Sequence, residues 1–379
     1  MENKTRVLHF IASDGLYGAE SVVLNLSMQL QGNYRQTAVI GCIVSSDNEN
    51  NALYNRAVEL GLETVKIVIA NKKLLTDLPK AAKQISALKI DIIHSHGYKP
   101  SVYGFVIAKL KAIKIMATCH LWFELANKPL KTKVLVSLEL LFYKWFSKVV
   151  GVSEPIKQVL ITKGVPERLV DVVPNGVDIN VMDNRLATRE KIRVSLDIAD
   201  DTFVLINSGR LTKQKAQSII VDAAKILREK NINFLVLIVG EGELQAALAI
   251  QISKLGLEHN IKMLGFCSNI DEMLVAADCF VMPSIDEGMP MSLLEAVAAE
   301  VPVVSTHVGD IEKLIQHQES GIVMPLNDAN ALADAVIELK EHPDLATRFS
   351  KNAKQKMQAI YSSETMAKAY SAIYSAIVR

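Results

Sequence analysis

Short runs of almost wholly apolar residues alternate along the chain with segments in which apolar residues recur at helical spacing. Such runs are typical of strands in a parallel sheet that helices cover on both faces, and the segments between them are typical of crossover helices. In the first half of the chain we expect strands at 6–12, 37–44, 64–69, 90–94, 114–119, 148–152 and 168–173. In the second half we expect strands at 203–208, 233–239, 260–264, 278–282, 302–305 and 321–324. The pattern predicts an α/β protein.

The alternation falls into two blocks, which predicts two doubly wound parallel sheets. A length of 379 residues is also typical of two domains. The turn sequence Pro174-Asn175-Gly176-Val177-Asp178 marks the junction. We therefore predict a first domain at 1–178 and a second at 179–362. The final segment, 363–379, has one apolar helical face, which we expect to pack back on the first domain.

Composition narrows the class of protein. Half of the residues are apolar, 22% are charged and the net charge is +1, which excludes a disordered chain. The four cysteines lie far apart and never form a Cys-x-x-Cys pair, so we expect buried thiols in a reducing compartment rather than a disulfide scaffold or a zinc site. The start of the chain lacks the long apolar stretch of a signal peptide, and no apolar run is long enough to span a membrane. These features favour a cytoplasmic protein.

The near-neutral net charge conceals an asymmetry between the two halves. Residues 1–182 carry a net +7 and residues 183–379 a net −6. Either the two solvated surfaces simply differ, or the first half faces an anionic acceptor or a membrane surface. No basic stripe interleaved with aromatic residues, helix-turn-helix pattern or zinc pattern occurs, so we expect no nucleic acid as a partner.

Ligands of open α/β sheets bind beyond the carboxyl ends of the strands, so the turns after the strands carry the candidate chemistry. The first turn, 14–20, contains Gly18 and leads into a helix, where glycine permits close backbone approach to an anion or simply shapes the turn. The strand at 203–208 is followed by Gly209 and by three cations within six residues, Arg210, Lys213 and Lys215. These cations can neutralise a diphosphate, although a solvated basic turn has the same composition.

Two glutamates follow the strand at 278–282. Glu287 lies in the loop, and Glu295 lies about one turn inside the predicted helix. Pro290 fits the first turn of that helix, so that Gly288 and Met289 would offer free N–H groups at its positive end. Acidic residues near a helix start also stabilise the helix dipole, which explains Glu287 better than Glu295.

The order and spacing of these motifs resemble the donor-binding elements of retaining nucleotide-sugar glycosyltransferases, above all glycosyltransferase family 4. The resemblance extends over the whole chain: Tyr17-Gly18-Ala19-Glu20 is similar to the N-terminal Gly-Gly-x-Glu turn of the family, and His94, His96 and His120 follow strands where the family carries histidines. It implies the GT-B fold, in which two Rossmann-like, doubly wound parallel-sheet domains face a cleft.

The resemblance also implies roles for individual residues. Arg210 and Lys215 would hold the donor diphosphate, Glu287 would bind hydroxyls of the transferred sugar, and Glu295 would bind the ribose. His120 would contact the donor sugar or position the acceptor, while His94 and His96 can equally be structural. The implied catalytic residues are Glu287, Arg210, Lys215 and His120. The implied donor-binding residues are Gly18, Gly209, Gly288, Met289, Pro290, Met291 and Glu295.

Four positions depart from the family pattern. Tyr17, Ala216, Glu300 and Asp310 stand where the family commonly has glycine. These departures concern the geometry of turns or contacts to the phosphates, and every implied charged ligand is present.

The sequence lacks the Asp-x-Asp motif through which metal-dependent transferases bind a cation. We therefore expect no metal and no cofactor, with Arg210, Lys215 and helix N-termini stabilising the leaving diphosphate. The resemblance implies retention of configuration by front-face attack. The co-substrate would be a UDP-, GDP- or ADP-sugar. A glycan or lipid-linked acceptor would belong to bacterial surface polysaccharide or lipopolysaccharide synthesis.

Two other functions fit the same architecture. A sugar-nucleotide epimerase would turn over the donor without an acceptor, and a nucleotide-sugar-binding protein would not turn it over at all. A nicotinamide dehydrogenase is not expected, because the Gly-x-Gly-x-x-Gly fingerprint is absent.

The segment 138–152 combines aromatic residues with lysines. This composition is typical of a helix on a membrane surface, but a crossover helix with a buried apolar face predicts much the same residues. Because the family often uses lipid-linked acceptors, peripheral attachment of the basic first domain to the inner face of the membrane stays open.

Overall fold

The computed structural model describes residues 4–13, 15–70, 73–120, 129–179, 185–267 and 269–379. The chain divides into two compact units. The first comprises residues 1–176 together with 363–379, and the second comprises residues 177–362. Asp14 of the first predicted turn lies outside the described residues.

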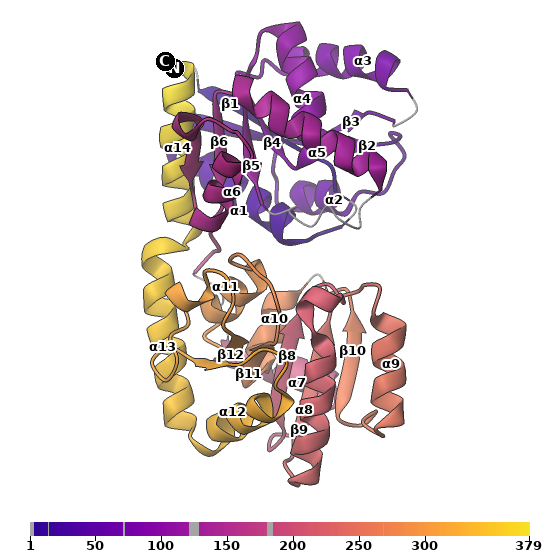
Figure 1. Ribbon diagram of the computed structural model, residues 1–379, viewed down its shortest axis with the longest axis vertical. Coiled ribbons are helices and arrows are strands. Elements are labelled where there is room, and N and C mark those ends of the chain that lie inside the picture. The colour runs from indigo at the N-terminus through magenta and orange to yellow at the C-terminus, as the bar shows by residue number, and fades with distance from the viewer. Residues whose placement is uncertain (1–3, 14, 71–72, 121–128, 180–184, 268) are drawn as a thin grey trace. The chain divides into compact units, whose positions relative to one another are not determined.

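The first unit is built on a parallel sheet, in which the described residues form seven strands in the order β3-β2-β1-β4-β5-β6-β7 (Figure 1). The strands are β1 (Thr5–Ile11), β2 (Gln36–Val44), β3 (Thr64–Val68), β4 (Ile92–His96), β5 (Lys114–Cys119), β6 (Lys148–Gly151) and β7 (Val170–Val172). The strand order reverses between β1 and β4, which makes the carboxyl ends of these two strands a topological switch point.

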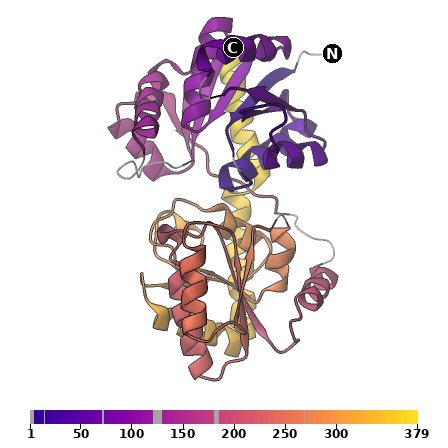
Figure 2. The ribbon, with the colours of Figure 1, turned by 90° about the vertical axis from the view of Figure 1, so that its right-hand side faces the viewer.

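Helices cover both faces of this sheet. Leu8 and Phe10 of β1 belong to a core packed against α3 (Leu74–Ala87), α4 (Tyr98–Lys111) and α5 (Leu130–Phe142). Ile11, on the alternate face, packs with α1 (Gly18–Asn33) and α2 (Ala52–Glu59). The C-terminal helix α14 (Ser363–Val378), yellow in Figure 2, lies against α1, and its tyrosines reach the face of the sheet at β4 and β5. The remaining helix, α6 (Glu154–Thr162), packs against β6 and β7.

The second unit repeats this architecture with six strands in its described part, in the order β10-β9-β8-β11-β12-β13. The strands are β8 (Phe203–Ser208), β9 (Phe234–Val239), β10 (Ile261–Gly265), β11 (Cys279–Met282), β12 (Val303–Thr306) and β13 (Ile322–Met324). The helices are α7 (Arg185–Ser195), α8 (Gln217–Glu229), α9 (Gln245–Lys254), α10 (Ile270–Ala276), α11 (Met291–Ala298), α12 (Ala329–Glu341) and α13 (Pro343–Ile360). Here the order reverses between β8 and β11.

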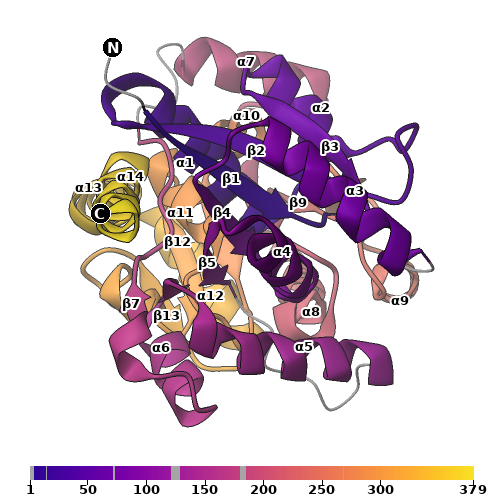
Figure 3. The same ribbon diagram turned by 90° about the horizontal axis from the view of Figure 1, so that it is seen from above.

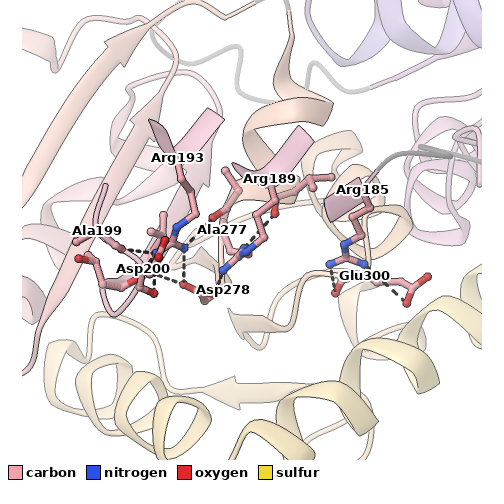
Figure 4. A network of polar contacts seen from close by, with 12 residues as sticks. Arg185, Arg189, Arg193, Ala199, Asp200, Ala277, Asp278 and Glu300 are labelled. Atoms are coloured by element: carbon pink, nitrogen blue, oxygen red, sulfur yellow. Dashed lines mark hydrogen bonds and ion pairs between the residues drawn. The ribbon is translucent and has the colours of Figure 1, made fainter. Parts of the chain in front are cut away.

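An arginine ladder on α7 holds the beginnings of β8 and β11 together (Figure 4). Arg189 and Arg193, one helical turn apart, both pair with Asp278, which also accepts a hydrogen bond of 2.7 Å from the backbone N–H of Val204. Arg193 further donates to the carbonyl oxygen of Ala199 at 2.8 Å. Because these partners lie at the amino ends of the two strands, the ladder is structural and lies at the opposite ends of the strands from their ligand-binding edge.

The predicted α/β fold is confirmed. Every predicted strand is present, with ends within two residues of those expected, because each apolar run is short and bounded by turn residues. All four cysteines are free thiols, but Cys267 is only partly buried, so the expectation that all four are buried is wrong for this residue. Within the described part of the chain, no helix is long and apolar enough to cross a membrane.

Candidate functional site

In the second unit, the loops that follow β8 and β11 are joined at the switch point. The backbone N–H of Ile285 donates to the carbonyl oxygen of Gln214 at 2.8 Å. The side chain of Gln214 returns a hydrogen bond of 2.7 Å to the carbonyl oxygen of Asp286. These two bonds place the basic loop after β8 directly beside the acidic loop after β11.

The joined loops bring Lys215 and Glu287 into contact. The Nζ atom of Lys215 lies 2.6 Å from Oε1 of Glu287, and their side chains are only 16% and 8% exposed. Arg210, on the same loop as Lys215, is exposed to solvent. The sequence prediction placed these three residues near one ligand, and the structure brings two of them together as a largely buried ion pair.

The loop after β12 packs its backbone against the backbone of Glu287 and Gly288. Gly309 has a φ of +57°, and a Cβ atom at this position would lie 2.0 Å from the carbonyl oxygen of Glu287. The backbone N–H of Asp310 donates to the carbonyl oxygen of Gly288 at 3.2 Å. Only glycine permits this close approach of two backbones, so Gly309 fixes the position of the acidic loop.

The helix that carries Glu295 begins slightly later than predicted. Pro290 is the N-cap of α11, rather than a residue of its first turn, and its carbonyl oxygen accepts hydrogen bonds from the N–H groups of Leu293 and Leu294. The first helical amide is therefore that of Met291, while Met289 is buried. The expectation that Pro290 lies in the first turn is therefore wrong by one position, while the role of Gly288 and Met289 as donors of free N–H groups stays a prediction.

Glu295 lies on α11 and is partly buried. Burial raises the pKa of its carboxyl group to about 7, and the negative charge of Asp271 contributes in the same direction. The carboxyl group is thus poised to change its charge near neutral pH, unlike an ordinary exposed glutamate.

Two departures from the family pattern coincide with left-handed backbone. Ala216 has a φ of +50° and Glu300 a φ of +53°, conformations that favour glycine. At Glu300 the side chain pairs with Lys354 at 2.7 Å. Tyr17 and Asp310, with φ values of −120° and −89°, occupy conformations open to any residue.

The first turn of the first unit ends at Gly18, which begins α1. Tyr17 is the N-cap and is 48% exposed, and its backbone N–H donates to the carboxylate of Glu20 at 3.1 Å. The turn therefore has the glycine and the helix start that the sequence predicts for binding an anion.

Three histidines form a hydrogen-bonded row at the carboxyl ends of the central strands of the first sheet. His9 lies in β1, His96 ends β4 and His120 follows β5, and these strands are neighbours. Nδ1 of His9 lies 3.1 Å from Nε2 of His96, and Nδ1 of His96 lies 3.0 Å from Nε2 of His120. His9 and His96 are buried, and His120 is partly exposed.

A second polar row ties the C-terminal helix to the same sheet face. His94 uses Nδ1 to contact the hydroxyl of Tyr374 at 2.7 Å and Nε2 to contact the hydroxyl of Thr118 at 2.7 Å. Thr118 also contacts the hydroxyl of Tyr370 at 2.8 Å. Because both nitrogens of His94 are engaged inside the unit, His94 has the structural role that the sequence left open.

All four of these histidines are neutral near neutral pH. Burial lowers the pKa of His9 to about 3 and that of His120 to about 4. It also lowers the pKa values of His94 and His96, and the neighbouring imidazoles add to this effect. Protonation of any one ring would place an uncompensated charge in the interior.

One group of side chains in the described residues has the geometry to hold a metal ion. His9, His94 and His96 each place one ligating atom within 4.8 Å of the others. However, both nitrogens of His94 and of His96 already take part in hydrogen bonds, so an ion would have to displace these contacts. The arrangement fits a network of shared protons better than a metal centre.

The sequence prediction missed His9 and the two tyrosines of α14. His9 is the only polar residue in the run Val7-Leu8-His9-Phe10-Ile11, and a polar residue inside a buried strand is a detectable signal. Tyr370 and Tyr374 carried no signal of this kind, because they fit the apolar face of an amphipathic helix.

Two models of known protein families together match most of the chain. Residues 17–181 match the family described as Glycosyltransferase Family 4, and residues 188–356 match the family described as Glycosyl transferases group 1. The two matches fall on the first and the second sheet respectively.

Individual relatives and solved structures agree with these families. The chain is 29% identical over 299 residues to the UDP-Gal:alpha-D-GlcNAc-diphosphoundecaprenol alpha-1,3-galactosyltransferase of Escherichia coli, covering 76% of each chain. It is 28% identical to the amylovoran biosynthesis glycosyltransferase AmsK of Erwinia amylovora, covering 72% of this chain and 66% of AmsK. The crystal structure of Anabaena HepE in complex with UDP-glucose superposes with a TM-score of 0.84 at 21% identity, covering 98% of this chain and 99% of HepE. This last similarity confirms the GT-B fold.

Proposed function

The chain belongs to the group 1 glycosyltransferases of family 4, and from this premise we propose that it transfers a sugar from a nucleotide-diphosphate sugar to a hydroxyl group of a glycan or lipid-linked acceptor. We further propose that the configuration at the anomeric carbon is retained and that no metal ion takes part. The E. coli relative is named for a UDP-sugar, and HepE was crystallised with UDP-glucose, which supports UDP as the nucleotide to test first.

The observation that carries this proposal is the Lys215–Glu287 ion pair at the switch point of the second unit. A carboxylate alone beside a diphosphate would repel it, whereas Lys215, 2.6 Å away, compensates the charge of Glu287. Lys215 can then share its charge with the diphosphate while Glu287 accepts hydrogen bonds from sugar hydroxyls. The exposed side chain of Arg210 adds a second cation that can bind two phosphate oxygens at once.

These groups suit the charge changes of glycosyl transfer. As the bond to the anomeric carbon breaks, negative charge grows on the diphosphate and positive charge grows on the sugar ring. Fixed cations at the leaving group lower the barrier without a metal ion. We propose that the acceptor attacks from the side of the leaving diphosphate, which itself takes the proton of the acceptor, so that no protein side chain acts as nucleophile.

The charge and the exposed apolar residues of the first unit support the proposal that the acceptor is anionic or bound to a membrane. It contains 24 basic against 15 acidic residues, a net +9. Helix α5 has a buried face, as a crossover helix requires, and also an exposed apolar stripe: Leu130, Val134 and Leu141 are 77%, 50% and 45% exposed. We propose that this stripe rests on a membrane surface that also presents a lipid-linked acceptor.

The test is incubation of the protein with labelled UDP-, GDP- and ADP-sugars, with and without a bacterial lipid extract. Transfer of label to an extracted acceptor, with the anomeric configuration of the donor retained in the product by NMR, supports the proposal. Conversion of the donor without acceptor would indicate an epimerase. Binding without turnover in every mixture would indicate a nucleotide-sugar-binding protein, and inversion would contradict the proposed chemistry.

A further inference from the structure

The histidine row of the first unit limits where its protons can lie. A neutral imidazole carries one N–H and one acceptor nitrogen. Each of the two contacts, at 3.1 and 3.0 Å, needs one N–H facing one acceptor. His96 takes part in both contacts, so it donates in one and accepts in the other. The whole row therefore has only two consistent arrangements, which differ in the direction that all the donors point.

The buried end of the row decides between these arrangements. Nε2 of His9 is buried and has no hydrogen-bond partner among the described residues. If the donors point inward, this atom carries an N–H with no acceptor. If they point outward, it is an acceptor without a donor. Orphaned buried N–H groups are rarer in proteins than under-used acceptors, so the outward direction is favoured.

We propose that His96 is a positioning residue that holds His120 in the Nδ1–H tautomer, so that His120 donates a hydrogen bond to an oxygen of the substrate. In the outward arrangement His96 donates from Nδ1, Nε2 of His120 accepts, and the proton of His120 must lie on Nδ1. The contact to His96 uses Nε2 of His120, and within the described residues no hydrogen bond to Nδ1 is present. The side chain of His120 is partly exposed. The substrate part of this inference rests on the proposed function, whereas the tautomer does not.

The neighbouring row holds the ring of His96 in place. The rings of His94 and His96 lie with their centroids 4.2 Å apart, and His94 is itself fixed by Tyr374 and Thr118. His96 therefore cannot turn freely to exchange its two nitrogens. Since Nδ1 of His120 already carries a proton, His120 acts as a donor to a hydroxyl or phosphate oxygen and not as a base through this atom.

The tautomer can be measured directly in the free protein. In protein with ¹⁵N-labelled histidine, the nitrogen shifts and couplings distinguish Nδ1–H from Nε2–H, and His120→Asn identifies the signals of His120. We expect Nδ1–H in the wild type. In His96→Leu the contact to His120 is lost, and we expect His120 to shift toward Nε2–H, the form that free imidazole side chains prefer.

Two further variants separate positioning from packing. His96→Asn keeps a polar atom at the Nδ1 position, so we expect it to restore Nδ1–H at His120. His9→Leu makes the same buried His-to-Leu change one residue further along the row; it leaves the His96–His120 contact intact, so His120 should keep Nδ1–H. Circular dichroism first establishes that each variant is folded. An Nε2–H signal for His120 in the wild type, or no change in His96→Leu, overturns the proposal.

Transfer kinetics then test the consequence for the substrate. We expect His96→Leu to lower kcat/KM about tenfold, the scale of one lost hydrogen bond, and His96→Asn to recover most of it. Unchanged kinetics in a folded His96→Leu variant would overturn the role of His120 as donor. If the NMR signals follow the expectation but no nucleotide sugar is turned over, the proposed function is wrong and the tautomer assignment stands.

Discussion

The two units place polar side chains at the same point of similar sheets but use different chemistry there. The second unit, with 18 basic and 26 acidic residues, concentrates charged groups, including the Lys215–Glu287 pair, at its switch point. The first unit has a net +9, yet its switch point is lined by neutral imidazoles. The net charge of a unit therefore does not predict the chemistry of its site.

The difference follows from what each arrangement can do. A compensated ion pair supplies charge, which suits a diphosphate whose negative charge grows during reaction. A row of neutral histidines supplies direction instead, because each donor fixes the next. Figure 3 labels the three strands involved: His9 lies in β1, His96 ends β4 and His120 directly follows β5. The ion pair needs only two loops, whereas the row needs three neighbouring strands.

Removing the charge of the second unit has the largest expected effect. Lys215→Ala should lower kcat roughly 10²- to 10³-fold, the loss of one charge-stabilising group worth about 2.7–4 kcal/mol. Arg210→Ala should have an effect of the same kind. Lys213 is an exposed lysine on the same loop, so Lys213→Ala is the matched control and its activity should stay near that of the wild type.

Excess EDTA should leave the transfer activity intact. Activity that is lost to EDTA and restored by magnesium or manganese would contradict metal independence.

The two glutamates of the second unit should separate by kinetic constant. Glu287→Gln should lower kcat about 10²-fold, because contacts to the reacting sugar tighten in the transition state. Glu295→Gln should mainly raise the donor KM, by about tenfold, since a ribose does not change during reaction. A Glu287→Gln enzyme with wild-type kcat, beside a Glu295→Gln enzyme that has lost it, would reverse the assigned roles.

The pH dependence of the donor KM sharpens this assignment. With a pKa of about 7, Glu295 gains a proton as the pH falls below neutral and then accepts ribose hydrogen bonds less well. We expect the wild-type donor KM to rise between pH 8 and pH 6 and that of Glu295→Gln to stay nearly constant over this range. A wild-type KM that does not change would argue against Glu295 as a donor ligand.

The first unit should lose stability in acid before the second. The folded-state pKa values of His9 and His120, about 3 and about 4, lie below the ordinary value of 6.5. Their contribution is complete above pH 6.5 and is lost as the pH falls toward 4, by about 3 kcal/mol for each group. The four histidines of the second unit, His259, His307, His317 and His342, are exposed.

Tryptophan fluorescence isolates this effect, because both tryptophans, Trp122 and Trp145, belong to the first unit. Urea unfolding followed by fluorescence should move to lower urea between pH 7.5 and pH 4.5 by more than the far-ultraviolet circular dichroism signal of the whole chain. In His9→Leu the fluorescence shift should be smaller. Equal shifts for both signals in the wild type would mean that the histidines do not govern acid stability.

Much of the fold and part of the site could be predicted from sequence, for physical reasons that differ between the units. Lys215 lies in the loop after β8 and Glu287 in the loop after β11, so the rule that strand ends form the site pointed to both loops, and the family resemblance then grouped the two residues around one donor. The row His9–His96–His120 depends on which strands are neighbours and on ring orientation, neither of which a linear pattern contains. The engagement of both nitrogens of His94 with Tyr374 and Thr118 likewise needed the packing of α14.

The exposed stripe on α5 should contribute moderately to binding at anionic vesicles. Trp145, 54% exposed and close to Phe105, extends the stripe, and Lys131 and Lys144 are exposed beside it. Trp145→Ser should weaken vesicle binding about tenfold, and physiological salt should weaken it further by screening the lysines. Leu75→Ser, which removes a 93% exposed leucine from α3, is the matched control and should bind as the wild type does. If the wild-type protein fails to bind such vesicles at low salt, the positive charge of the first unit does not serve membrane binding.

The smallest expected effect concerns the loop that carries Lys215. Ala216 is the N-cap of α8 with a φ of +50°, a conformation that costs about 1 kcal/mol for a residue with a Cβ atom. Ala216→Gly removes this strain and places a better N-cap residue at the helix start, while the unfolded chain gains some freedom that offsets part of the gain. We expect a net stabilisation of about 0.5–1 kcal/mol, measured as a higher urea midpoint with an unchanged slope. Glu300→Gly is the instructive partner, since it relieves the same kind of strain at a φ of +53° but removes the ion pair with Lys354. If Ala216→Gly is stabilising and Glu300→Gly is neutral or destabilising, the strain at Glu300 is offset by its ion pair and the strain at Ala216 is not offset. A destabilised Ala216→Gly variant would mean that packing of the alanine methyl group outweighs the backbone strain.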